Sequence, residues 1–196
     1  MFADRGLLNV LVLAAIMGLL QLLGPEHLRY QPQLLHIGEW WRFLTGHWVH
    51  ANWTHYALNM AGLGLCLALT EVRWTLWDWS WRILLLSVGI SILFWQFNPD
   101  IGWYVGFSGV LFGLYVLAAV DSLARQKLIA VALLIIIGLK IVFDLIPSAK
   151  IDSSDLIGVP VLTEAHLYGV LVALCVVLLM QVQVYFRFRQ KQDIHE

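Results

Sequence analysis

The sequence predicts an all-α polytopic membrane protein, a bundle of six transmembrane helices in a chain of 196 residues. Hydrophobic residues make up 60% of the chain and charged residues only 13%, whereas an ordinary soluble domain has roughly 45–50% and about 25%. The apolar residues gather in runs close to the roughly 20 residues that one bilayer crossing requires. This composition excludes a soluble globular enzyme, and the short loops leave room for one membrane domain over residues 1–196.

Six apolar runs define the expected helices, and charges, prolines or polar residues bound each of them. The runs cover residues 7–24, 50–70, 81–97, 105–120, 128–146 and 165–186. The first follows a single basic residue, Arg5, and has no small-residue cleavage site before Pro25, so we expect a retained span and not a signal peptide. The turn-forming sequence Asn98-Pro99-Asp100 separates the third run from the fourth.

The placement of Lys and Arg predicts the orientation, because basic residues accumulate in cytoplasmic loops. With the N-terminus inside, the inner segments contain Arg5, Arg73, Arg82, Arg125, Lys127, Arg187, Arg189 and Lys191. The outer loops contain Arg29, Arg42 and Lys150. Both termini are therefore expected on the cytoplasmic side (N-in/C-in). A net charge of −1 gives no bulk attraction to nucleic acid, so we expect the lipid bilayer as the surroundings and no nucleic-acid partner.

Polar residues stand at the starts of the second, fourth and sixth runs, where lipid makes them costly and function is the usual reason for them. They are His55, Asn59, Ser108 and His166. In the N-in arrangement these three helices all run from outside to inside, so their first turns share one depth. Small residues on the same helix faces, which let membrane helices approach closely, are Gly109, Gly113, Gly169 and Ala173. We therefore expect Ser108 and His166 to lie within hydrogen-bonding distance.

These residue types match the parts of a nucleophilic serine site. A serine hydroxyl becomes a strong nucleophile when a neighbouring histidine takes its proton. The oxyanion that forms then needs donors, such as backbone N–H groups or Asn and His side chains. Ser108 and His166 fit the first two roles, and the polar residues of the second run fit the third. Asp144 and Glu164 are the nearest acidic residues, yet neither has an evident place beside His166, so the sequence favours a Ser-His dyad.

Other interpretations of the polar residues stay open at this point. A serine at a helix start is usually a packing or capping residue. His47, His50 and His55 suggest zinc, but the sequence has no His-Glu-x-x-His motif and no carboxylate or Cys to complete the set, so we expect no metal and no cofactor. Lys140 and Asp144, four residues apart, most simply form an intrahelical ion pair, with a proton or ion relay as the alternative. A transporter would show repeats or paired broken helices, which the sequence lacks.

At these residues the sequence resembles the rhomboid family of intramembrane serine proteases. The similarity runs from Glu39 to Ala173 and rests on motifs that occur in a fixed order. They are Trp41-Arg42, then His50-Ala51-Asn52-Trp53-Thr54-His55-Tyr56-Ala57-Leu58-Asn59 followed by Glu71, then Gly106-Phe107-Ser108-Gly109, and finally Ala165-His166-Leu167-Tyr168-Gly169. The resemblance implies a rhomboid-like bundle of six transmembrane helices and serine endopeptidase activity within the membrane.

The resemblance also implies a role for each matched residue. Ser108 would be the nucleophile and His166 the general base, and the Ser108 amide would form the oxyanion hole with His55 and Asn59. Supporting roles would fall to Trp41, Arg42, His50, Glu71, Gly106, Gly109 and Gly169. Phe112 departs from the family pattern, because many rhomboids carry Tyr at this position, and Phe keeps the ring but loses the hydroxyl.

Within the family, the small size, the stretch 39–47 and Val159-Pro160-Val161 are most similar to the rhombosortase branch. This similarity implies an enzyme of the bacterial inner (cytoplasmic) membrane. Its substrates would be secreted proteins with a glycine-rich motif, a C-terminal hydrophobic anchor and a basic tail. The alternatives are a general rhomboid protease with other transmembrane substrates and a non-proteolytic relative that binds membrane proteins. We expect the loops at residues 31–46 and 148–164 to shape access to the serine.

Overall fold

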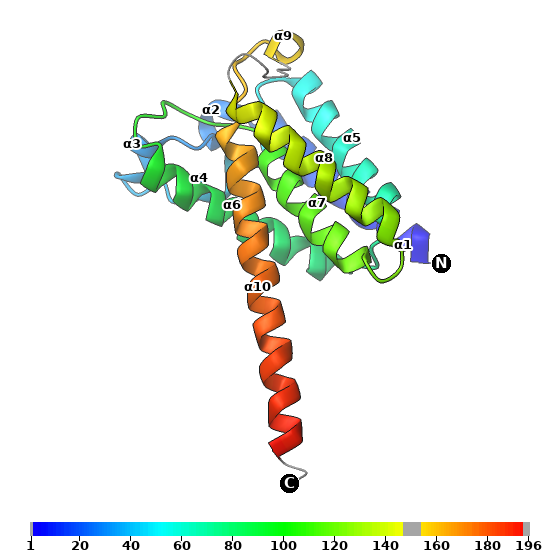
Figure 1. The fold of residues 1–196 in the computed structure, drawn as a ribbon. Coiled ribbons are helices and arrows are strands. Elements are labelled where there is room, and N and C mark those ends of the chain that lie inside the picture. The colour runs from blue at the N-terminus through cyan, green and yellow to red at the C-terminus, as the bar shows by residue number, and fades with distance from the viewer. Residues whose placement is uncertain (1, 147–153, 194–196) are drawn as a thin grey trace.

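The computed structural model describes residues 2–146 and 154–193, and this part of the chain is an all-helical bundle (Figure 1). The long helices are α1 (Phe2–Leu22), α5 (Trp53–Thr70), α6 (Leu76–Phe97), α7 (Ser108–Ser122), α8 (Lys127–Leu145) and α10 (Glu164–Asp193). Short helices in the connections are α2 (Pro25–Leu28), α3 (Pro32–Leu35), α4 (Arg42–Thr45) and α9 (Ser154–Ile157). Three of the basic residues used to predict the membrane orientation are not described by the structure. They are Lys150 and the side chains of Arg187 and Lys191.

Each of the six predicted runs forms a long helix, and the largest differences from the predicted bounds are at the starts of α1 and α6 and at the end of α10. A capping box explains the earlier start of α6. The Asp78 N–H donates to the Thr75 hydroxyl at 3.1 Å, and the Thr75 N–H donates to the Asp78 carboxylate at 3.0 Å. These polar residues lowered the local hydropathy, and this is why the sequence placed the helix start at residue 81.

Four of the helices in the described ranges, α1, α6, α8 and α10, are long and apolar enough to cross a bilayer. Helix α7 is apolar but has only 15 residues. Helix α5 has 18 residues and carries the polar side chains of His55 and Asn59. The chain is therefore an all-helical multi-pass membrane protein, whereas crossing by α5 and α7 stays a prediction.

Helix α7 is the central element of the bundle. It packs against α5, α6, α8 and α10, and most of its residues are buried. Figure 1 shows it running beside α8 through the middle of the molecule, while α10 extends well beyond the other helices. A hydrogen bond of 2.7 Å from the Tyr115 hydroxyl to the Gly62 carbonyl ties α7 to α5. Polar bonds of this kind hold helices together where lipid supplies no hydrophobic driving force.

The contact between α7 and α10 depends on three glycines. A Cβ on Gly169 would collide with the carbonyl oxygen of Gly109, and a Cβ on Gly109 would lie 2.7 Å from the Ala165 carbonyl oxygen. A Cβ on Gly113 would lie 2.8 Å from the Gly169 carbonyl oxygen. The two backbones therefore touch, as the small residues on these helix faces predicted. Because Gly109 and Ala165 lie at the helix starts, the first turns of α7 and α10 are the parts brought together.

The connection between α1 and α5 is a packed scaffold that contains α2, α3 and α4. Arg42, only 4% exposed, donates through Nε to the Glu39 carboxylate at 2.6 Å and through Nη1 to the Arg29 carbonyl at 2.8 Å. A buried guanidinium is tolerated when it is paired in this way. The sequence predicted a polar access loop over residues 31–46, but in the structure this segment serves as a support.

This scaffold also holds the segment that leads into α7. Tyr30 and Tyr104 exchange backbone hydrogen bonds of 3.0 and 2.9 Å, and the Gly106 N–H donates to the Gly46 carbonyl at 3.1 Å. Buried backbone N–H and C=O groups need hydrogen-bonding partners. These bonds provide partners for the backbone of the segment immediately before Ser108.

Substitution of Gly169 by Ala should destabilise the bundle by about 1–3 kcal/mol or more, because the added methyl group overpacks the contact between α7 and α10. Thermal unfolding in detergent would measure the effect. Gly138→Ala in α8 is the matched control, since nothing lies within 4 Å of a Cβ there. The control should be neutral or slightly stabilising because Ala favours helix over Gly by about 1 kcal/mol. Equal melting temperatures for both variants would contradict a tight contact.

Candidate active site

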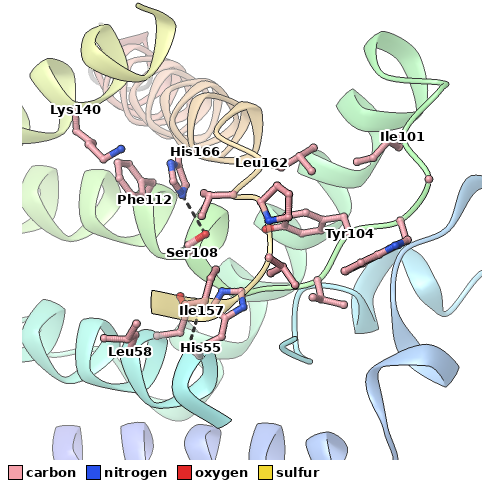
Figure 2. Close-up of a pocket in the computed structure, with 17 residues that line it drawn as sticks. His55, Leu58, Ile101, Tyr104, Ser108, Phe112, Lys140, Ile157, Leu162 and His166 are labelled. Carbon is pink, nitrogen blue, oxygen red and sulfur yellow. Dashed lines mark hydrogen bonds between the residues drawn. The ribbon is translucent and has the colours of Figure 1, made fainter. Parts of the chain in front are cut away.

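Three helices bring a hydroxyl, an imidazole and a carboxylate to one place. Ser108 is the first residue of α7, and His166 lies in the first turn of α10. The His166 Nε2 atom is 3.1 Å from Ser108 Oγ, the contact that Figure 2 draws as a dashed line. The other ring nitrogen, Nδ1, is 3.1 Å from Oδ2 of Asp144 in the last turn of α8. The imidazole therefore bridges a serine and an aspartate.

The surroundings of His166 set its tautomer and the direction of its ring. An ionised carboxylate only accepts hydrogen bonds, so the contact with Asp144 places the imidazole proton on Nδ1. This leaves Nε2 free to accept the proton of the Ser108 hydroxyl. Phe112, one turn after the serine, stacks on the imidazole with ring centroids 4.3 Å apart and planes inclined by 14°. Stacking and hydrogen bonding together hold a ring that is only 5% exposed.

The carboxylate is the part of this cluster that the sequence missed. The sequence favoured a dyad and assigned Asp144 to an ion pair with Lys140. The structure contains that ion pair, formed through Oδ1, and adds the contact of Oδ2 with His166. Glu164, the other acidic neighbour, is exposed. The spacing of four residues between Lys140 and Asp144 predicts their ion pair. The contact of Asp144 Oδ2 with His166 depends on the rotation of α8 about its own axis, and the hydrophobic pattern of an apolar helix does not specify that rotation.

A cavity of about 580 Å³ opens onto the serine. Its walls come from α5, α7, α8 and α10 and from two connecting segments, 101–105 and 157–162. Most of the lining is apolar, as Leu58, Ile101 and Leu162 in Figure 2 illustrate. The second segment is anchored by the Asn52 amide, which donates to the Ile157 carbonyl at 2.6 Å. Of the access loop predicted over residues 148–164, residues 157–162 contribute to the cavity wall, and residues 148–153 lie outside the described residues. Residues 31–46 do not line the cavity.

His55 and Asn59 line the same cavity from α5. The Asn59 amide donates to the His55 carbonyl at 3.1 Å, and a primary amide has a second N–H to offer. Gly106, with φ of 127°, adopts a conformation that favours glycine, and a Cβ there would lie 2.8 Å from Cε1 of His55. The Ser108 N–H belongs to the first turn of α7, where N–H groups have no intrahelical acceptor. The side chains of His55 and Asn59 therefore line the same cavity as Ser108, whose own N–H begins α7.

The predicted supporting residues outside the cavity occupy structural positions. The His50 backbone exchanges hydrogen bonds of 2.7 and 2.9 Å with the Gln21 side chain of α1, and its ring packs edge-on against His55. Glu71 ends α5 in a left-handed conformation with φ of 47°. Trp41, half exposed, precedes α4.

Two comparisons relate this chain to known proteins. The family model of the Rhomboid domain matches residues 37–183, a region that includes α4 to α9 and most of α10. The chain is also similar to "Rhomboid-like protein 11, chloroplastic" from Arabidopsis thaliana, with 30% identity over 88 residues. That alignment covers 43% of this chain and 30% of the plant protein, so the chain matches less than a third of that relative's length.

A fluorophosphonate probe, which reacts with activated serine hydroxyls, should label the purified protein at Ser108. Labelling depends on proton transfer to Nε2, so His166→Ala should lose it. Intact mass and peptide mapping would measure the result, with the buried Ser87 and Ser91 as internal controls. Labelling that persists in His166→Ala, or that falls on another serine, would contradict an activated Ser108.

Proposed function

This chain belongs to the rhomboid family, and from that premise we propose that it is an intramembrane serine endopeptidase that cleaves transmembrane anchors of other proteins. One observation carries the proposal: Ser108 Oγ and His166 Nε2 lie 3.1 Å apart at the wall of a cavity large enough for a peptide segment. The family match supports it, because rhomboid proteins are typically intramembrane serine proteases. The proposed catalytic residues are Ser108 and His166, and the reaction requires no metal or cofactor.

The reaction would proceed in two steps. In the first, Ser108 Oγ attacks the carbonyl carbon of the scissile peptide bond while His166 Nε2 takes the hydroxyl proton. The Ser108 N–H and the His55 and Asn59 side chains donate to the tetrahedral oxyanion. The imidazolium then gives its proton to the leaving amine, and an ester remains on Ser108. In the second step water attacks the ester while His166 takes its proton. The bond between the acyl carbon and Ser108 Oγ then breaks, the imidazolium returns the proton to Ser108 Oγ, and the new carboxyl terminus is released.

We propose the N-in/C-in arrangement with α1, α5, α6, α7, α8 and α10 as the six crossings, all within one domain. The length of α7 supports a reaction centre below the membrane surface. Fifteen residues at 1.5 Å each span about 22 Å, which is less than the hydrocarbon thickness of about 30 Å. With the inner end of α7 at the cytoplasmic surface, Ser108 would lie several ångströms below the outer one. The bacterial inner membrane, cut near its periplasmic face, is the proposed location.

The proposed substrates are secreted proteins with a glycine-rich segment beside a C-terminal hydrophobic anchor, as in the rhombosortase branch. A helix hides its carbonyl groups in internal hydrogen bonds, so it must unwind before Ser108 attacks. Glycine weakens helix by about 1 kcal/mol per residue relative to Ala, and this supports a preference for such segments. The apolar walls at residues 101–105 and 157–162 suit an unwound apolar peptide.

Ser108→Ala and His166→Ala should each abolish cleavage by the folded protein, because the first removes the nucleophile and the second its base. The assay would incubate purified protein with two substrates, one with a glycine-rich C-terminal anchor and one general rhomboid substrate, and would measure products by intact mass. Undiminished cleavage by either variant would remove that residue from the proposed mechanism.

The same assay tests the substrate class. Cleavage of the glycine-rich anchor alone would support the rhombosortase-like specificity. Cleavage of both substrates would instead support a general rhomboid protease. If the folded wild-type protein cleaves neither in several lipid compositions, the non-proteolytic binding function becomes the better account.

Loss of one side-chain donor should slow turnover without preventing folding. His55→Ala and Asn59→Ala are each expected to lower kcat by about 10²–10³, the usual cost of one oxyanion donor. Steady-state kinetics on the preferred substrate would measure the change, with Leu65→Ala as the control, since Leu65 is an exposed residue of the same helix and does not line the cavity. Wild-type kcat in both donor variants would exclude an oxyanion role for this helix.

A further inference from the structure

We infer that Asp144 completes a Ser-His-Asp triad within the membrane, as a positioning residue that acts through His166, and that Lys140 balances its charge. The inference rests on the proposed function and deepens it, since it adds a third residue to the Ser-His pair. The residues come from α7, α10 and α8, and His166 contacts both Ser108 and Asp144, while Asp144 also contacts Lys140. Nothing in the family match or in the plant relative assigns this role.

The first argument is the placement of the carboxylate. The Asp144 side chain is only 3% exposed and the His166 side chain 7%. An acidic side chain within a membrane helix is expensive and normally has a partner and a use. Here the two oxygens have separate partners: Oδ1 contacts Lys140 Nζ, and Oδ2 lies 3.1 Å from His166 Nδ1. The ion pair with Lys140 explains the position of Oδ1 but does not explain why Oδ2 contacts His166.

The second argument is chemical. When His166 takes the Ser108 proton, both ring nitrogens carry hydrogen and the ring gains a positive charge. A carboxylate at Nδ1 stabilises that imidazolium and, before the reaction, keeps the proton off Nε2. The aspartate keeps its negative charge throughout. Lys140, whose side chain is 27% exposed at the cavity wall, compensates that charge in the resting site, because an isolated carboxylate would be costly to bury.

The third argument concerns Phe112. Its ring restricts the imidazole from one face, at a centroid distance of 4.3 Å, but a phenyl ring has no hydrogen-bonding group. Stacking of this kind permits rotation of the imidazole in its own plane. The contact with Asp144 fixes that remaining rotation, so the two neighbours restrict different motions of His166.

A purely structural role is the competing explanation, in which Asp144 only ties α8 to α10. The two explanations differ in kinetics. A positioning residue affects the chemical step, so Asp144→Asn should lower kcat by about 10²–10⁴ with little change in KM. The rate of fluorophosphonate labelling at Ser108 should fall in parallel, because this reaction uses the same proton transfer but needs no bound substrate.

The experiment compares wild type, Asp144→Asn, Lys140→Met and the double variant Lys140→Met/Asp144→Asn. The double variant removes both charges, so it leaves no uncompensated lysine and guards against simple misfolding. Asp121→Asn in α7 is the matched control: this aspartate also forms an i,i+4 ion pair, with Arg125 at 3.0 Å, but lies 13 residues after Ser108 near the other end of the helix. Melting temperature, cleavage kinetics and the labelling rate are measured for each protein.

Retention of the kcat and labelling loss in the double variant, with normal rates for Asp121→Asn, would support the triad. Wild-type rates in Asp144→Asn, or recovery of wild-type rates in the double variant, would overturn it and leave the proposed protease intact. Labelling without cleavage in the wild type would refute the proposed substrates, while the labelling rates still decide the role of Asp144. Absence of both reactions in the folded wild-type protein would overturn both proposals.

Discussion

The close approach of α7 and α10 is the interaction on which the candidate site depends. Lipid tails are as apolar as the side chains of the helices, so tight packing and polar bonds must hold the bundle together. At this contact Gly109 and Gly169 let two backbones touch where any side chain would keep them apart. The serine directly precedes one of these glycines, and the histidine lies three residues before the other. The packing of the bundle and the geometry of the proposed chemistry therefore share one cause.

Much of this arrangement could be predicted from the chain alone. Apolar runs marked each long helix, because a bilayer crossing imposes a length and a composition that few other structures need. Small residues on the relevant faces of α7 and α10 predicted their contact, and the polar residues predicted which helix ends would meet. The pairing of Ser108 with His166 followed from these two arguments together, since neither the Gly-Phe-Ser-Gly sequence nor a single histidine specifies it.

Three features could not be predicted, for different reasons. The helices α2, α3, α4 and α9 have four residues each. This is about one helical turn, which is too short to show a repeating hydrophobic pattern. The support given by the connection between α1 and α5 depends on Arg42 and on the pairing of Tyr30 with Tyr104. Arg42 and Tyr30 are distant in sequence from Ser108, so no local pattern relates them to it. The approach of Asp144 to His166 depends on the rotation of α8, and a helix that is apolar on nearly every side carries no signal for it. The spacing of Asp144 from Lys140 predicted their ion pair, and this local explanation left no reason to expect a second contact with His166.

The origin of the site in three separate helices has a consequence for the biogenesis of the protein. Ser108, Asp144 and His166 are synthesised one after another, and no single helix holds more than one of them. Under the proposed mechanism the serine is an ordinary alcohol until α10 packs against α7. Assembly of the bundle would then act as the switch that a soluble protease obtains from removal of a propeptide. A misfolded chain would be inert for the same reason.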